Sequence, residues 1–455
     1  MTPIRNEGIL TPGVPVWAPI VSRSNTVMMH FSRTFFSCLL LVGFCATAAD
    51  AQEWTRFRGP DGTGIGRAKG IPAGIDESSY TWKVKLPGRG HSSPVLWGNK
   101  IFLTCESPGG TGSAPRRGSA GSAGKANRQL VCLSGTDGKV LWTWRDEFTT
   151  YRKNGLNSFA SSTPAVDAER AYLTWASGGK YFAVAIDHAG KKVWQRELGD
   201  FYAKHGAGSS PIVIDGTVLV GKDHAGEASR LFGLDAKTGS TRWKIDRKSG
   251  PSSYIVPAIY RPAGAGAQAI FISCAEGVTS VNPADGKVNW RVKCNFTLKS
   301  VASPVVAGGL IFVSAGRGGG GRESAVVRPP GGARRASIAY KLDKDVPYVP
   351  TPIAVGDYLF VLNDKGVLTC VEPGTGRKLW KEKFTGTHYP SPVCTGGRIY
   401  IINNKGEIST VQAASTYKLV ATGKLPEGTH ATPAVANGCM YIRTFNHLIC
   451  VGAKK

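Results

Sequence analysis

Ten side chains suited to binding or acid–base chemistry lie in the segments that precede a repeated proline. They are His91, Arg152, Asn157, His205, Tyr254, Lys299, Tyr348, His388, Tyr389 and His430. Histidine can act as an acid, a base or a metal ligand, and a ring of basic and aromatic groups suits an anionic or polar ligand. We therefore predict a ligand-binding funnel at these positions. The alternative is that they are ordinary polar residues of exposed loops.

No spacing in the chain gives these histidines a catalytic or metal-binding role. None of them can be paired with a carboxylate from sequence, and a Ser/His/Asp triad is recognised by its geometry rather than by its spacing. The chain has no CxxC motif, no adjacent cysteine pair and no Cys/His cluster with zinc spacing. We therefore expect no metal site, and we name no catalytic residue.

The prolines belong to an internal repeat that would position these side chains. A small residue, a proline and an apolar pair recur at Pro94, Pro164, Pro211, Pro257, Pro304, Pro352, Pro392 and Pro433, with successive spacings of 70, 47, 46, 47, 48, 40 and 41 residues. Each copy holds four short strands, and the proline begins the first strand, where its missing N–H costs no ladder bond. Eight such copies predict an all-β, eight-bladed β-propeller of four-stranded antiparallel blades.

A second motif marks the fourth strand of the repeat. A glycine precedes a tryptophan by four residues at Gly138/Trp142, Gly190/Trp194, Gly239/Trp243, Gly286/Trp290 and Gly376/Trp380. Because each Trp lies on an outer strand, away from the axis, we expect it to pack between blades rather than bind a cofactor. The fifth copy lacks this motif, and the seventh has Tyr417 near the expected Trp.

The last copy, from Ala431 to Val451, ends before an outer strand of this kind. The alternating segment Tyr80–Leu86 resembles that strand, with Trp82 in the position of the repeated Trp. We expect this N-terminal strand to complete the last blade. It would close the ring, so that no exposed sheet edge remains where the two ends of the propeller meet.

The cysteines follow the same repeat. Cys132 and Cys370 each lie ten residues before their Trp, where other copies have Gly233 and Ser280, and Cys450 matches them by local pattern. This position favours a slot for a small buried side chain, filled mostly by unpaired cysteines. The even number of cysteines after the predicted leader leaves disulfides as the alternative.

Two stretches rich in Gly and Arg interrupt the repeat, at residues 107–128 and 316–337. We expect both to be low-complexity loops between a second and a third strand, on the same face as the predicted funnel. The GRGGGG run in the second stretch lacks the Gly-Lys-Ser/Thr ending of a phosphate-binding loop.

Residues 1–51 are predicted to be a leader and signal peptide, with translation expected to start at Met28 or Met29. Arg33, the apolar run Phe35–Phe44 and the A-x-A site ending at Ala51 follow in the order of a signal peptide, and the run is too short to span a bilayer. We expect an exported protein, periplasmic or extracellular. Residues 52–455 would form a single propeller domain without a transmembrane segment.

The net charge is +25 at pH 7. Such a charge is compatible with a basic surface of no specific role, or with attraction to anionic partners. No RRM, KH, zinc-finger or helix-turn-helix pattern accompanies it, so we expect no nucleic-acid partner. We expect the protein to be a monomer.

The repeated small-Pro-Val strand starts and TG-x3-W outer strands resemble the pyrroloquinoline quinone (PQQ) repeat family, from about Trp54 to Val451. The resemblance implies an eight-bladed propeller. The family contains quinoprotein dehydrogenases, which carry an adjacent cysteine pair beside the quinone and Glu, Asn and Asp ligands for calcium, and propellers without this chemistry, such as BamB-like scaffolds.

This chain has no adjacent cysteine pair and no matching set of calcium ligands. The resemblance therefore favours an exported, non-catalytic binding or scaffold protein of the cell envelope, without a cofactor. Its partner would be an envelope protein or an anionic glycan. The alternative is a divergent PQQ-dependent oxidoreductase that acts on an alcohol or a sugar, with PQQ and calcium as cofactors.

Overall fold

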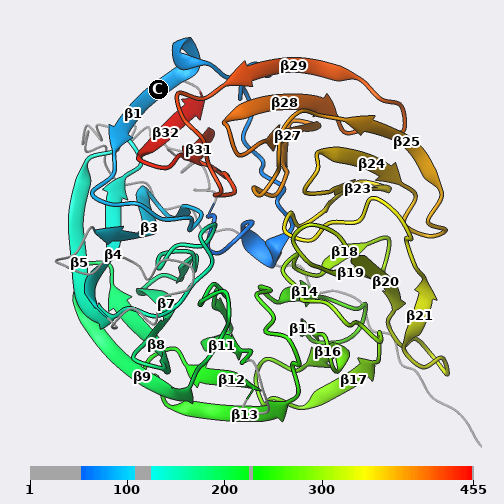
Figure 1. The fold of residues 1–455 in the computed structure, drawn as a ribbon, viewed down its shortest axis with the longest axis horizontal. Coiled ribbons are helices and arrows are strands. Elements are labelled where there is room, and N and C mark those ends of the chain that lie inside the picture. Colours follow the sequence, from blue (N-terminus) through cyan, green and yellow to red (C-terminus); the bar gives the residue numbers. More distant parts are fainter. Residues whose placement is uncertain (1–52, 108–123, 225–228, 453–455) are drawn as a thin grey trace, which may run out of the picture. The chain divides into compact units, whose positions relative to one another are not determined.

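The computed structural model describes residues 53–107, 124–224 and 229–452. The predicted leader and most of the first Gly-rich stretch lie outside these residues. The described part of the chain forms eight four-stranded sheets, arranged as blades around a central axis (Figure 1). All strand pairs within the blades are antiparallel, as in β10–β11 and β12–β13. The predicted fold, an eight-bladed β-propeller, is confirmed.

The first four blades follow the chain in order, each from the axis outwards. Blade 1 consists of β2 (Val95–Trp97), β3 (Lys100–Ser107), β4 (Lys125–Ser134) and β5 (Val140–Thr149). Blade 2 consists of β6 (Ala165–Val166), β7 (Arg170–Ser177), β8 (Lys180–Asp187) and β9 (Lys192–Asp200). Blade 3 consists of β10 (Ile212–Ile214), β11 (Thr217–Lys222), β12 (Ser229–Asp235) and β13 (Thr241–Arg247). Blade 4 consists of β14 (Ala258–Tyr260), β15 (Gln268–Ser273), β16 (Gly277–Val281) and β17 (Val288–Val292).

The other four blades repeat this order, except that the last takes its outer strand from the N-terminal side. Blade 5 consists of β18 (Val305–Ala307), β19 (Leu310–Gly316), β20 (Arg322–Arg328) and β21 (Ser337–Tyr340). Blade 6 consists of β22 (Ile353–Val355), β23 (Tyr358–Leu362), β24 (Val367–Val371) and β25 (Lys378–Lys383). Blade 7 consists of β26 (Val393–Thr395), β27 (Arg398–Ile402), β28 (Glu407–Gln412) and β29 (Leu419–Lys424). Blade 8 consists of β30 (Ala434–Ala436), β31 (Cys439–Arg443), β32 (His447–Gly452) and β1 (Tyr80–Lys85).

The predicted closure is present in blade 8. Strand β1 pairs antiparallel with β32, and Trp82 lies opposite Cys450. Two short 3-10 helices, η1 (Pro60–Gly62) and η2 (Glu77–Ser79), precede this strand. No helix in the three described ranges is long and apolar enough to cross a membrane.

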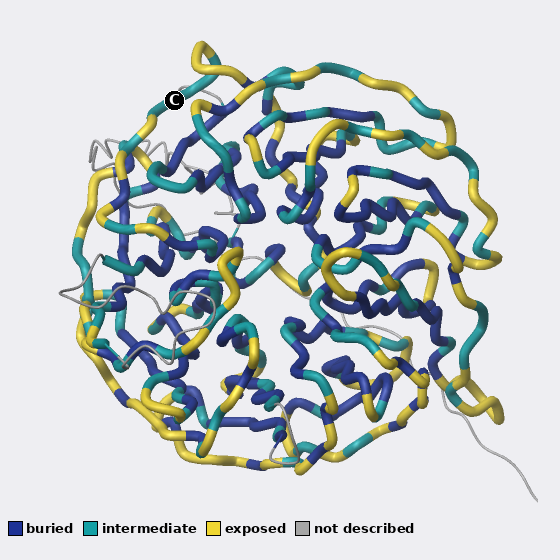
Figure 2. Tube along the Cα trace, viewed as in Figure 1, coloured by how far each residue is buried: buried dark blue, intermediate teal, exposed yellow. Residues whose placement is uncertain are grey.

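Burial follows the position of a strand within its blade. Figure 2 shows buried residues concentrated on the inner and middle strands, and exposed residues along the outer rim. In blade 3, for example, β11 is almost wholly buried, whereas β13 alternates between exposed and buried residues. The middle strands are therefore continuous apolar runs because blades cover both of their faces, and the outer strands alternate because they have a solvent side.

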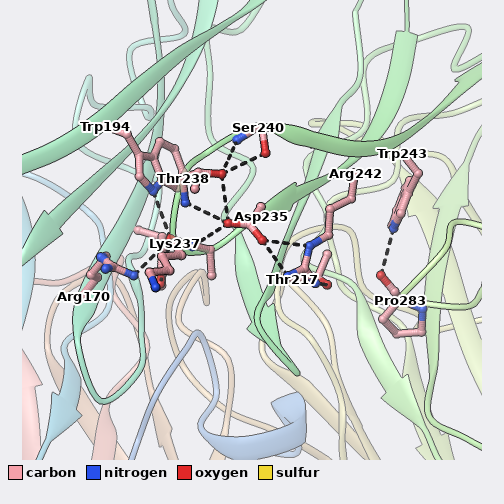
Figure 3. A network of polar contacts seen from close by, with 12 residues as sticks. Arg170, Trp194, Thr217, Asp235, Lys237, Thr238, Ser240, Arg242, Trp243 and Pro283 are labelled. Carbon is pink, nitrogen blue, oxygen red and sulfur yellow. Dashed lines mark hydrogen bonds and ion pairs between the residues drawn. The ribbon is translucent and has the colours of Figure 1, made fainter.

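The repeated Trp links each blade to the next. Trp194 of blade 2 donates a hydrogen bond from Nε1 to the backbone oxygen of Ala236 in blade 3, at 3.0 Å (Figure 3). Its indole ring covers Gly239, where an added Cβ would lie 2.5 Å from the ring. Trp243 donates in the same way to Pro283 in blade 4, at 2.9 Å. The predicted packing of the Trp between blades is therefore confirmed.

The same link recurs elsewhere in the ring. Trp82, Trp142 and Trp380 donate to the backbone oxygens of Gly135, His188 and Ala414, and Tyr340 takes this role in blade 5, where it donates to Pro373. The motif thus has two halves: the Trp reaches forward, and the Gly receives the Trp of the preceding blade.

Blades 4 and 7 depart from this pattern. Trp290 donates to the side chain of Gln268 in its own blade. In blade 7, Ala421 stands in the Trp position opposite Thr410. Tyr417 lies in the turn before β29 and packs against Trp380, with 5.4 Å between ring centroids. Tyr417 thus lies near the Trp position in sequence, as expected, but does not replace the Trp: its ring receives the Trp of blade 6.

The small slot predicted from the cysteines also lies beside the Trp. Cys132, Cys370 and Cys450 pair across the sheet with Trp142, Trp380 and Trp82, and Gly233 and Ser280 pair with Trp243 and Trp290. A Cβ added to Gly233 would lie 2.2 Å from the ring of Trp243. No disulfide joins any of the cysteines that the structure describes. The small-slot interpretation is therefore confirmed, and the disulfide alternative is not supported in the described part of the chain.

The second Gly-rich stretch, 316–337, is not a single loop. It contains β20, the third strand of blade 5, whose residues Ser324–Val327 are buried. Only residues 317–321 connect the second and third strands, and residues 329–336 connect the third and fourth. The expected loop was wrong because Gly- and Arg-rich segments flank a short apolar strand. Of the first stretch, residues 125–128 already belong to β4.

The Trp–Gly contact gives a testable prediction. Gly239 has φ +71°, and an alanine there would meet the Trp194 ring. We expect Gly239→Ala to lower the free energy of unfolding by about 2–4 kcal/mol, from backbone strain and overpacking together. Gly216 of the same blade has φ +68° but no atom closer than 3.7 Å to an added Cβ, so Gly216→Ala isolates the strain and should cost about 1 kcal/mol. Equal losses in denaturant titrations would contradict a packing role for Gly239.

Candidate ligand-binding cavity

A cavity of about 850 Å³ lies on the axis of the propeller and is lined by every blade. The segments that lead into the inner strands supply two rings of side chains. The ring directly before the repeated prolines consists of Ser93, Thr163, Ser210, Val256, Ser303, Thr351, Ser391 and Thr432. The ring three residues before them consists of His91, Ser161, Gly208, Tyr254, Val301, Val349, Tyr389 and His430. Alternate residues of an extended segment point the same way, which explains why these two positions share the cavity wall.

The first ring is a belt of hydroxyl groups. The backbone N–H of Ser93 donates to the hydroxyl of Thr163 at 3.0 Å, and that of Thr163 donates to Ser210 at 2.8 Å. The same bond joins Val256 to Ser303, Ser303 to Thr351, Thr351 to Ser391 and Ser391 to Thr432. The belt was missed from sequence because these residues were read only as small. The signal was visible, since seven of the eight are Ser or Thr.

The floor of the cavity is made by the N-terminal segment around η1, which Figure 1 shows at the centre of the ring. Phe57 lines the cavity, and Asp61 pairs with Arg261 just beyond the far end of β14. Arg58 is only 1% exposed. It donates five hydrogen bonds to backbone oxygens, including those of Pro352 and Pro392 at the starts of two inner strands.

Arg56 is buried beside Arg58 and donates to Pro257 at 2.7 Å. Burial lowers the pKa of Arg58 to about 9 and that of Arg56 to about 10, because the charged guanidinium groups are removed from water. Carbonyl dipoles therefore hold both charges at the floor. Added Cβ atoms on Gly64 and Gly62 would lie 2.7 Å from Arg58 and 2.4 Å from Arg56, so the glycines of the sequence RFRGPDGTG leave room for its two arginines.

Eight of the ten residues predicted from sequence line the cavity: His91, Asn157, His205, Tyr254, Lys299, Tyr348, Tyr389 and His430. Two do not. Arg152 is exposed and lies outside the lining, and His388 is buried outside it, next to Gly366. Asn157 lines the cavity, but its amide oxygen accepts from Ser158 and Ser161 of its own loop, and its amide nitrogen donates to the backbone oxygens of His205 and Ala207 in the next loop. The Asn157 side chain therefore joins two loops at the cavity and is occupied by these bonds. For the other seven residues, a role in binding remains a prediction.

One wall of the cavity is aromatic. The rings of His91 and His430 lie 4.5 Å apart, and Tyr389 meets His430 edge to face at 4.6 Å. Phe445 packs against His430 at 5.3 Å from outside the lining. Burial lowers the pKa of His91 to about 3, and the neighbouring His430 ring contributes to this shift. Burial also lowers the pKa of His430. Both imidazoles are therefore neutral at pH 7, and the wall is uncharged.

Another part of the lining is cationic. Lys299, Arg317, Arg322 and Lys365 line the cavity, and Asp364 is the one carboxylate among the lining residues that the structure describes. Asp364 already accepts the backbone N–H groups of Tyr348 and Val349, and it lies 3.4 Å from Arg322. Sequence reasoning missed Arg322 and Asp364, because Arg322 belongs to the stretch interpreted as a loop and Asp364 to an ordinary turn.

Positive groups accumulate around Lys299, and the nearby Glu323 carboxylate is bound to the backbone N–H groups of Thr297 and Leu298. Burial is the main cause that lowers the pKa of His205. The positive charges of Lys299, Lys204 and Arg152 lower it further. The pKa of Lys299 is lowered by burial and by Lys204. An anion placed here would relieve this repulsion.

The family model described as "Outer membrane protein assembly factor BamB" matches residues 74–202, 144–382, 325–420 and 364–453, which together include every blade. The chain belongs to this family of PQQ-like repeat propellers.

Individual members of the BamB-type family are distant. The chain is 23% identical over 226 residues to the outer membrane protein assembly factor BamB of Yersinia pestis, covering 46% of this chain and 54% of that protein. The chain thus spans about half the length of this curated relative. The BamB structure from Moraxella catarrhalis has 12% identity and a TM-score of 0.56, over 82% of this chain and 97% of that one. Quinohemoprotein alcohol dehydrogenase from Comamonas testosteroni has 12% identity and a TM-score of 0.58, over 90% and 82%. These similarities establish the fold alone.

The cavity of this BamB-type propeller does not fit the calcium that accompanies PQQ in quinoproteins. Calcium takes six to eight oxygen ligands, mostly carboxylates and carbonyls. The lining offers Asp364, whose oxygens are already used by backbone N–H groups and Arg322. In the described ranges, no three His, Cys, Asp or Glu side chains are grouped so as to hold a metal. The donor set of the cavity suits an anion instead.

The buried imidazole of His388 should make the stability of the fold sensitive to acid. Burial lowers its pKa from 6.5 to about 4, so the unfolded chain binds a proton more readily than the native state below pH 6.5. Stability should therefore fall as the pH decreases through the interval from 6.5 to 4, and His388 alone should account for about 2 kcal/mol between pH 7 and pH 5. Urea titrations of His388→Gln should show a shallower decline than the parent protein below pH 6.5 and the same slope above pH 7. Parallel curves throughout would exclude this role.

Proposed function

We propose that this BamB-type propeller is an exported, non-catalytic binding protein of the cell envelope, with the axial cavity as its ligand site. The observation that carries the proposal is the chemistry of the lining. Two buried histidines are neutral and lie against each other, and Asp364 is engaged by backbone N–H groups and Arg322. The described lining therefore places no carboxylate beside either imidazole to orient it or to share its proton, so it offers no recognisable general acid–base pair.

The envelope location rests on two further supports. The sequence predicts a signal peptide within residues 1–51, and a relative is named as an outer membrane protein assembly factor. Partners of the proposed protein are an envelope protein at the loop face or an anionic glycan in the cavity. The net charge of +25 favours anionic partners.

The competing function is a PQQ-dependent oxidoreductase, and the two can be separated directly. Purified protein would be incubated with PQQ and Ca²⁺ and assayed for dye-linked oxidation of alcohols and sugars. We expect no turnover above that of a heat-unfolded control, because the lining offers calcium no free carboxylate. Sustained oxidation that needs both PQQ and Ca²⁺ would overturn the proposal. Periplasmic fractionation of the tagged protein, with the protein retained in the cytosol as the contrary outcome, tests the location.

A further inference from the structure

We propose that the cavity binds a saccharide carrying an anionic group, a uronate or a sugar phosphate, with the sugar ring against Tyr389, His430 and His91 and the anion at Lys299. The inference rests on the proposed function, whose ligand site it specifies. At about 850 Å³, the cavity lies within the range of roughly 300–1,000 Å³ that small-molecule sites occupy.

The aromatic wall supplies the surface for a sugar ring. Tyr389, His430 and His91 come from three successive blades, and Phe445 supports them from behind, so the three rings form one continuous arc. A pyranose presents a face of C–H groups that packs on neutral aromatic rings, while its hydroxyls face outwards. Tyr and neutral His suit such a ligand because each combines an apolar ring face with a polar atom.

The cationic side supplies the anchor for an anion. Arg322 is already committed, since Nη1 donates to the backbone oxygens of Arg317 and Gly321 and Nη2 lies 3.4 Å from Asp364. Lys299 makes no ion pair with a carboxylate in the described part of the chain, and the charged side chain that shifts its pKa is another lysine. Arg317 and Lys365 also line the cavity without an ion pair in the described part of the chain, but both are exposed, whereas Lys299 is half-buried. Lys299 is therefore the lining cation at which a charge-assisted bond to a carboxylate or phosphate gains most from burial.

The belt and the small residues of the second ring complete the site. Ser93, Ser391 and Thr432 line the cavity two residues after His91, Tyr389 and His430, at the same three blades. Ser161 and Gly208 leave blades 2 and 3 without a bulky side chain in that ring. A Cβ added to Gly208 would approach only Tyr254, at 3.4 Å, so a larger side chain there would project into the cavity.

Titration calorimetry on the intact protein tests the proposal with trigalacturonate, glucose 6-phosphate and neutral maltotriose as probes. We expect at least one of the two anionic sugars to bind, and maltotriose to bind at least tenfold more weakly. Which anionic sugar binds distinguishes a uronate from a phosphate ligand. Binding should weaken about tenfold in Lys299→Met and in Tyr389→Ala, and Gly208→Leu should abolish it by occupying the space. Lys237→Met, on an exposed outer turn, is the matched charge control and should bind as the parent does.

Each variant is first compared with the parent by thermal unfolding, and only variants that keep the parental midpoint are interpreted. Absence of binding by both anionic sugars, equal binding of maltotriose, or parental affinity in Lys299→Met would overturn this inference. A protein that binds no acidic sugar and shows no PQQ-dependent oxidation would refute the inference alone. PQQ-dependent oxidation would refute the proposed function itself.

Discussion

Arg58→Met is expected to lower the free energy of unfolding by more than about 3 kcal/mol. The guanidinium makes five hydrogen bonds to backbone oxygens, three of them at the inner-strand starts of blades 6 and 7. Methionine matches much of the volume but leaves those buried oxygens without a donor, at a cost of about 1–3 kcal/mol for each oxygen that water cannot reach. Arg58→Lys keeps the charge but not the planar fork, so an intermediate loss is expected.

Arg56 provides the internal comparison for Arg58. It is buried as well, but its one hydrogen bond joins Pro257. Arg56→Met should therefore cost less than half as much as Arg58→Met in guanidinium titrations. If Arg58→Met were as stable as the parent protein, removal of a desolvated charge would have offset the lost bonds, and the floor would not depend on them.

Replacing β1 (Tyr80–Lys85) by a Gly-Ser linker of six residues is expected to lower the thermal midpoint by more than about 10 °C and to produce oligomers. Blade 8 would lose its outer strand, Trp82 would no longer reach Gly135 of blade 1, and the edge of β32 would be open to other chains. The linker keeps the length of the chain, so the floor segment remains tethered.

The same replacement in β29 (Leu419–Lys424) is the matched control for β1. Both strands have six residues, lie on the outer rim and alternate between half-buried and exposed positions. Only β1 joins the two ends of the ring. Its replacement should therefore lower the thermal midpoint more in scanning calorimetry, and form more oligomer in size-exclusion chromatography, than the replacement of β29. Equal effects would mean that β1 contributes only as an outer strand and that ring closure adds nothing.

The fold could be predicted from sequence because its information is repeated. Eight prolines marked the inner strands, and five Gly-x3-Trp motifs marked the outer ones, so one damaged copy did not obscure the others. Closure by Tyr80–Leu86 was predicted from the likeness of YTWKVKL to an outer strand. The prediction failed in blade 5, where β20 lies inside a Gly- and Arg-rich stretch and local composition conceals a short buried strand.

The candidate site was predicted less completely, for a physical reason. Residues that precede the prolines point to the axis in every blade, so His91, Tyr254, Tyr389 and His430 could be predicted from their position. Arg152 and His388 lie in the same loops but face elsewhere, which a loop sequence does not encode. The role of Arg58 in the floor could not be predicted from sequence. Arg58 donates to the backbone oxygen of Pro392, 334 residues away, and no local pattern predicts such a contact.

That sequence separation has a consequence for how the chain acquires its native state. Arg58 and its partners Thr351, Pro352 and Pro392 lie 293, 294 and 334 residues apart, so an arginine synthesised before every blade completes its contacts only once the start of blade 7 exists. Contacts between distant residues slow folding. A chain that stopped before blade 6 would leave Arg58 with only its local partners Gly62 and Thr63, and β1 would lack its partner β32. The N-terminal segment therefore reaches its full set of stabilising contacts only when the C-terminal blades have also been synthesised.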